Sequence, residues 1–265
     1  MDIEMLEYIE MVLGLFHILM ACADTMWHIY LEPKGLHNHP CSVWKQFCQL
    51  YPNLHAKLGT HLGFCVMHDS VEHILAAWIL DCTWTITKAG SLDEFWKKAP
   101  TWEELEELAN NIHIQYVMQA TPTSDPVHKG SDDSFMNSCM FLHNALLYRT
   151  LALAMQYGAI GLVEDTVTYW IPIFKSTRKH KYAAHMNCFL TRLRALPPCL
   201  AQAIRLNWMC NPGGRHDGFC AIDWLVELNN LYTKVDIQSG GDHQHIHMWL
   251  SLFTQDTDPI AQFNT

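Results

Sequence analysis

Apolar residues recur at intervals of three and four along most of this chain, and that spacing constrains its fold more than any other feature. Residues three and four apart lie on one face of an α-helix, so such a repeat predicts a helix with one buried side. The repeat is clearest in four segments, Phe16–Tyr30, Phe64–Thr87, Phe135–Tyr157 and Lys179–Leu196. Apolar residues make up 49% of the 265 residues, which is enough to form a core and argues against global disorder. We therefore expect a mainly α-helical, multi-helix globular bundle with at most one or two short strands.

Local signals place the ends of the helices. Ser91 and Thr101 each precede a helical segment as an N-cap, and Glu104 completes a capping box with Thr101. The segment NPGGRHDG, residues 211–218, predicts a turn. Further helices are expected over 42–50, 161–175, 199–209 and 221–235. Alternation typical of strands is confined to residues 9–16 and to the tail HQHIHMWLSLF, residues 243–253.

One segment, ATPTSDPVHKGSDDS at residues 120–134, combines Pro, Ser, Thr, Gly and Asp without any periodicity. Such a composition is typical of a linker. It predicts an N-terminal helical half over 1–119 and a C-terminal helical half over 135–265. The two halves can still pack as one domain, because a chain of this length suits one large domain or two small ones.

The charge of the chain is distributed unevenly. The formal net charge is −10, which argues against nucleic-acid binding by the whole surface. Residues 166–216, however, contain no Asp or Glu and hold eight of the 17 basic residues. These are Lys175, Arg178, Lys179, Lys181, Arg192, Arg194, Arg205 and Arg215.

Two interpretations of this basic stretch remain open. Lys and Arg beside Tyr182 and Phe189 suit contact with phosphates and stacking with bases, which predicts a DNA or RNA partner. Alternatively, the basic residues pair with acidic helices such as Glu103–Glu107, in this chain or in a protein partner. The second interpretation would make the chain a helical interaction module.

The ten cysteines contain no CxxC spacing, and most lie among apolar residues. In a large chain that is not dominated by loops, this pattern predicts reduced thiols in an intracellular protein. The cluster RKHK, Arg178–Lys181, leaves a nuclear location open as a weak signal. No apolar run is long enough to predict a transmembrane helix, so no membrane association is expected. No nucleophile elbow, phosphate-binding loop or dinucleotide fingerprint occurs either.

The segment AIDWLVELNNLYTKV, residues 221–235, carries an unusual polar stripe. Asp223, Glu227, Asn230 and Lys234 share one side of the expected helix. The stripe is either the boundary face of a surface helix or part of a site. Asp223 and Glu227 are like charges four residues apart, which is unfavourable unless a cation or a hydrogen-bond donor lies nearby. They are the candidate catalytic residues of this chain.

Histidines supply the one candidate metal site. His243, His245 and His247 lie on one side of the chain if that tail is extended, and imidazole nitrogens are common ligands of divalent metals. No cysteine or carboxylate stands at a fixed spacing from them, so a polar tail is the alternative. No other cofactor is expected.

Five blocks of sequence, in this order, carry a family resemblance. They are GLFHILMACADTMW (Gly14–Trp27), PTWEELEELA (Pro100–Ala109), GAIGLVEDTVTYWIPIF (Gly158–Phe174), KHKYAAHM (Lys179–Met186) and DWLVELNNLYTKV (Asp223–Val235). The chain resembles the fungal family called domain of unknown function 6589, which is abundant in mushroom-forming basidiomycetes. The resemblance covers nearly the whole chain, from about Leu13 to Gly241.

The resemblance implies an origin in mobile elements, because longer members are similar to mobile-element proteins. It suggests a transposase-like ancestor with a ribonuclease-H-like core, in which Asp and Glu side chains hold two divalent metals that activate water. Members often carry a Gly-Asp-Gln segment before the LFH block, and some have an acidic residue where this chain has Gly14. Both are missing here, so we expect an N-terminally shortened member that binds nucleic acid without catalysis. A remnant metal-dependent nuclease that uses Asp223 and Glu227 is the alternative.

Overall fold

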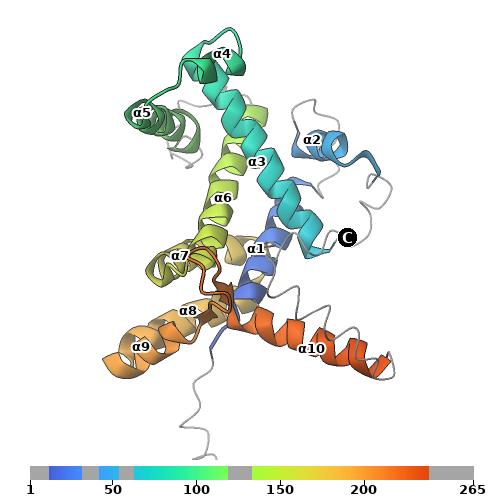
Figure 1. Ribbon diagram of the computed structural model, residues 1–265, viewed down its shortest axis with the longest axis vertical. Coiled ribbons are helices and arrows are strands. Elements are labelled where there is room, and N and C mark those ends of the chain that lie inside the picture. The colour runs from blue at the N-terminus through green and yellow to red at the C-terminus, as the bar shows by residue number, and fades with distance from the viewer. Residues whose placement is uncertain (1–11, 32–41, 54–62, 119–132, 239–265) are drawn as a thin grey trace, which may run out of the picture. The chain divides into compact units, whose positions relative to one another are not determined.

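A computed structural model describes residues 12–31, 42–53, 63–118 and 133–238 (Figure 1). Within these ranges the chain forms ten α-helices, one π-helical turn and a two-stranded ribbon. The first elements are α1 (Leu15–Tyr30), α2 (Val43–Leu50), α3 (Phe64–Thr87), α4 (Leu92–Lys97), α5 (Trp102–Ile112) and η4 (His113–Val117). There follow α6 (Asp133–Gln156), α7 (Ile160–Ser176), α8 (His180–Ala195), α9 (Pro198–Leu206), β1 (Met209–Cys210), β2 (Cys220–Ala221) and α10 (Ile222–Gln238). The expected mainly α-helical fold is confirmed.

The chain divides into two compact units. One comprises residues 1–22 and 150–265, and the other comprises residues 23–149. Their boundaries fall inside α1 and α6. Most of the expected linker, residues 120–132, lies outside the described residues, so a division of the chain at that segment stays a prediction.

The unit of residues 23–149 is built around α3 and α6, whose apolar faces are buried. Some polar groups inside this core are paired: the His68 ring and the Tyr148 hydroxyl lie 2.6 Å apart. Glu72 on α3 and Arg149 on α6 form an ion pair of 2.8 Å. Such pairing matters because an unpartnered polar group in a core costs free energy.

The unit of residues 1–22 and 150–265 contains α7 and α8, which pack against one another. Trp170 and Phe174 on α7 are fully buried. On α8, Phe189 is buried with its ring 4.9 Å from that of Trp208, which follows α9. In Figure 1, β1 and β2 lie beside the beginning of α10, which extends away from α8 and α9.

The local boundary signals are borne out in the structure. The hydroxyl groups of Ser91 and Thr101 accept hydrogen bonds from the backbone N–H groups of Glu94 and Glu104, and α3 spans Phe64–Thr87 as expected. Gly158 ends α6 with a φ of +67°, a conformation that favours glycine. Pro172 does not end α7, which continues to Ser176.

Two local expectations were wrong. Leu15 and Phe16 begin α1, although residues 9–16 alternate in a strand-like way. The helix expected over 199–209 ends at Leu206. The residues after it form the short ribbon with β2, because backbone pairing across the turn outweighs the local periodicity.

Within the described ranges β1 and β2 are the only strands. No helix of those ranges is long and apolar enough to span a membrane.

Replacing Thr101 by alanine tests the capping box. The Thr101 hydroxyl accepts from Glu104 N–H at 3.3 Å, and the Glu104 carboxylate accepts from Thr101 N–H at 2.8 Å. Removal of the hydroxyl leaves a helix N–H group without its cap, so urea unfolding should show a loss of about 1 kcal/mol. The exposed Glu107→Gln on the same helix is the matched control and should change stability by less than about 0.5 kcal/mol. An equal effect of both changes would contradict the capping role.

Candidate functional site

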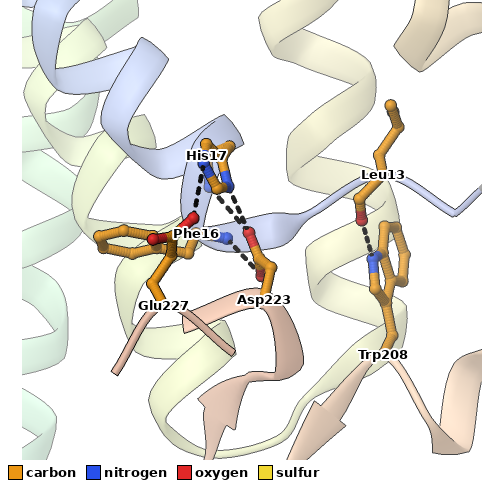
Figure 2. A network of polar contacts seen from close by, with 6 residues as sticks. All are labelled: Leu13, Phe16, His17, Trp208, Asp223 and Glu227. Carbon is orange, nitrogen blue, oxygen red and sulfur yellow. Dashed lines mark hydrogen bonds and ion pairs between the residues drawn. The ribbon is translucent and has the colours of Figure 1, made fainter. Parts of the chain in front are cut away.

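Asp223, in the first turn of α10, caps the beginning of α1 (Figure 2). Its Oδ1 accepts a hydrogen bond from Phe16 N–H at 3.2 Å, and its Oδ2 accepts one from His17 N–H at 3.1 Å. The first N–H groups of a helix have no partner within the helix, and a carboxylate also interacts favourably with the positive end of the helix dipole. Asp223 therefore serves α1 as a cap from more than 200 residues away in sequence.

His17 adds a side-chain contact to this cap. Its Nδ1 lies 2.9 Å from Asp223 Oδ2, and its Nε2 lies 4.0 Å from Glu227 Oε1. The imidazole thus lies between the two carboxylates, as Figure 2 shows. The Asp223 side chain is 17% exposed and that of Glu227 is 50% exposed, so Asp223 is the better enclosed of the two.

The approach of Asp223 to α1 depends on Gly14. A Cβ atom at position 14 would lie 2.3 Å from Asp223 Oδ2, far inside van der Waals contact. The position therefore has room for hydrogen but not for a side chain while Asp223 stays in place. Gly14, His17 and Asp223 form one arrangement, which we call the α1 cap.

Two hydrogen bonds, one from a side chain and one from the backbone, hold the α1 cap in position. Trp208 Nε1 donates a hydrogen bond to the Leu13 carbonyl oxygen at 2.5 Å, and Ile222 N–H donates to the Trp208 carbonyl oxygen at 3.2 Å. The rings of Phe16 and Trp224 pack with their centres 4.2 Å apart. Residues 13–17 therefore contact both Trp208, which lies next to β1, and the start of α10 (Figure 2).

The expected need for a donor near Asp223 and Glu227 is met by His17 and by two backbone N–H groups. Sequence reasoning missed His17 as the partner, because no local pattern links residues that are 206 apart. In the described ranges no group of three or more His, Cys, Asp or Glu side chains is arranged to hold a metal ion. The candidate ligands His243, His245 and His247 lie outside those ranges.

The eight basic residues of the acid-free stretch differ in their surroundings. Six are exposed: Lys175, Arg178, Lys181, Arg192, Arg194 and Arg215. Lys179 and Arg205 are partly buried. Lys175 lies in the last turn of α7, Arg178 lies in the turn before α8, and Lys181 lies in the first turn of α8.

Two carboxylates that flank this stretch, Glu164 and Asp217, form ion pairs with two of its arginines. Glu164 accepts hydrogen bonds from Arg205 Nε at 2.5 Å and Nη2 at 3.0 Å, and these bonds raise the pKa of the Arg205 guanidinium. Arg215 Nε lies 3.3 Å from Asp217 Oδ1. By contrast, no described carboxylate lies within 4.0 Å of Lys175, Arg178, Lys181 or Arg194.

The two aromatic residues expected beside these charges, Tyr182 and Phe189, differ in their exposure. Phe189 is 5% exposed and packs against Trp208, so it belongs to the core and not to a stacking surface. Tyr182 is 37% exposed and lies one residue after Lys181. Only Tyr182 of this pair is placed where a base could contact it.

A family model described as a family of unknown function (DUF6589) matches residues 2–258 of the chain. No curated protein and no solved structure matches it.

Proposed function

The chain belongs to the family of unknown function DUF6589, and from that premise we propose that it binds nucleic acid through the phosphate backbone and performs no catalysis in this form. The binding surface is the basic face, which we define as Lys175, Arg178, Lys181, Arg192 and Arg194. We further propose, from the resemblance of the five sequence blocks, that the protein is fungal and derived from a mobile element.

The observation that supports this proposal concerns Lys175, Arg178, Lys181 and Arg194, which are exposed and have no described carboxylate within 4.0 Å. Four members of the basic face have no acidic partner among the described residues, and α8 itself contains no Asp or Glu. An exposed ion pair is worth little, but an unpaired cluster of like charges creates a field that attracts a polyanion.

The spacing along α8 also suits an extended ligand. Lys181 and Arg192 are eleven residues apart, which is three helical turns, so they lie on one stripe about 16 Å apart. Lys175 and Arg178 continue the charge around the α7–α8 turn. Such contacts neutralise phosphates and release counterions without reading bases, so the expected binding is largely independent of sequence.

A helical module that binds a protein partner is the second candidate. Acidic helices such as α5, with Glu103, Glu104, Glu106 and Glu107 exposed, would offer charges complementary to the basic face. A competition experiment relates the two candidates. A short duplex would displace a protein partner only if both ligands contact the same side chains of the basic face.

Titration with salt tests the nucleic-acid proposal. With four or five phosphate contacts, the affinity for a short DNA duplex should fall by about 10²- to 10³-fold between 50 and 200 mM salt. Fluorescence anisotropy with a labelled duplex measures this fall, and an unrelated sequence of equal length should bind equally well. Binding that is absent, or that does not change with salt, would show that the basic face does not contact phosphates.

A further inference from the structure

Two thiols face one another across the β1–β2 ribbon. Cys210 and Cys220 are direct partners in the antiparallel register, and their Sγ atoms lie 3.5 Å apart. Both side chains are partly buried and neither is in a disulfide. A disulfide requires an S–S distance of about 2.05 Å and a Cα separation of about 4.4–6.8 Å, and directly opposed residues of an antiparallel pair meet the second requirement.

The position of this thiol pair sets it apart from the other described cysteines. Cys210 lies two residues after Trp208, which bonds to Leu13, and Cys220 lies three residues before Asp223, which caps α1. A covalent bond between the two cysteines would therefore join the two segments that hold residues 13–17. The turn between them, residues 211–219, would become part of a closed loop.

We propose that Cys210 and Cys220 are a redox-modification site, which a peroxide converts to a reversible intramolecular disulfide that fastens the α1 cap. This inference does not depend on the proposed nucleic-acid binding. The oxidant is a hydroperoxide such as hydrogen peroxide, and a small dithiol is the reductant that reverses the change.

The reaction proceeds in two steps. The Cys210 sulfur attacks one oxygen of hydrogen peroxide, so that its O–O bond breaks, the sulfur becomes a sulfenic acid and water leaves after proton transfer. The Cys220 thiol then attacks the Cys210 sulfur, the S–S bond forms, and the S–O bond breaks with loss of a second water. Two thiols and one peroxide thus give one disulfide and two waters. Burial raises the pKa of Cys220 to about 12, so Cys220 is the less reactive thiol and Cys210 reacts first with the peroxide. Cys220 loses its proton to the departing oxygen as its sulfur forms the S–S bond.

Peptide mapping tests the bond directly, because the chain offers a convenient protease site. Arg215 lies between the two cysteines, so trypsin cuts within the loop. Cleavage after Arg205, Arg215 and Lys234 gives the peptides 206–215 and 216–234, each with a single cysteine. After treatment with peroxide and alkylation of free thiols, we expect these two peptides to remain joined in the absence of reductant. Addition of a dithiol should separate them.

Thermal unfolding provides the second readout. The disulfide would close a loop of eleven residues, which restricts the unfolded chain and should raise Tm by about 5 °C. The rise should disappear in Cys210→Ser and in Cys220→Ser. It should persist in Cys199→Ser, which changes an exposed cysteine of α9 and serves as the matched control.

Several results would overturn the proposal. Joined peptides that link Cys82 to Cys139, or two protein molecules to one another, would show that oxidation occurs elsewhere. Oxidation of Cys210 to the sulfinic acid without a cross-link would show that Cys220 cannot reach it. A cross-link that leaves Tm unchanged would show that the bond does not fasten the cap.

Discussion

Reversing the charge of Lys175, Arg178 and Lys181 should reduce the affinity for a DNA duplex by about 10²- to 10³-fold at 0.1 M salt. All three side chains are exposed, and no described carboxylate pairs with them. Each lost phosphate contact should also reduce the slope of log affinity against log salt by about one. The triple variant Lys175→Glu, Arg178→Glu, Lys181→Glu should therefore bind more weakly to every duplex and respond less to salt.

A matched control separates local contact from net charge. The triple variant Lys88→Glu, Lys97→Glu, Lys98→Glu changes the net charge by the same amount, at exposed positions in the unit of residues 23–149. It should retain affinity to within about threefold. Similar losses in both variants would indicate a general charge effect and contradict the assignment of the basic face. Circular dichroism and urea unfolding should show that both variants are folded.

The choice of these three residues depends on the structure. Sequence alone favours Arg178, Lys179 and Lys181, because all three lie within the four residues RKHK. Lys179 is only partly exposed, and its backbone N–H donates a hydrogen bond to the Phe174 carbonyl oxygen at the start of α8. Burial raises the pKa of the Cys22 thiol, and the positive charge of Lys179 opposes that rise. Substitution of Lys179 would disturb packing as well as binding, so Lys175 gives the cleaner test.

The helices were predictable because their signals are local. Apolar spacing placed α1, α3, α6 and α8 to within two residues at each end, and a side-chain hydroxyl marked the starts of α4 and α5. Gly158 ends α6 for a similarly local reason, since its conformation depends on its own missing side chain. These features need no information from distant parts of the chain.

The β1–β2 ribbon and the α1 cap were not predictable, because their partners are distant in sequence or too short to show a pattern. A two-residue strand has no measurable alternation, so the helix expected over 199–209 included Met209, which lies in β1. The like charges of Asp223 and Glu227 indicated that a donor must be present, but not which one. Only the folded chain brings His17, Phe16 N–H and Gly14 to the carboxylate.

Replacing Asp223 by alanine should destabilise the protein by about 2–4 kcal/mol. The change removes the acceptor for two backbone N–H groups and for the His17 ring, and charge-assisted hydrogen bonds of this kind are among the stronger ones. Asp223→Asn keeps one acceptor oxygen and should lose less than half as much. Glu227→Ala removes a half-exposed carboxylate 4.0 Å from His17 and should change stability by less than about 0.5 kcal/mol. Equal losses at both positions would contradict the capping role of Asp223.

Gly14→Ala tests the same cap from the other side and should cost about 1–3 kcal/mol on its own. The added Cβ would lie 2.3 Å from Asp223 Oδ2, so the carboxylate must move and release the α1 N–H groups. In the background of Asp223→Ala the two closest contacts are gone and only the Cβ atom of residue 223 remains, at 3.1 Å, so the same change should cost less than about 1 kcal/mol. The double-mutant cycle, measured by urea unfolding, should therefore show a coupling of about 1–3 kcal/mol between residues 209 positions apart. Additive losses would mean that Gly14 and Asp223 act on stability separately, whereas strong coupling would establish that the start of α1 and the start of α10 form one structural unit.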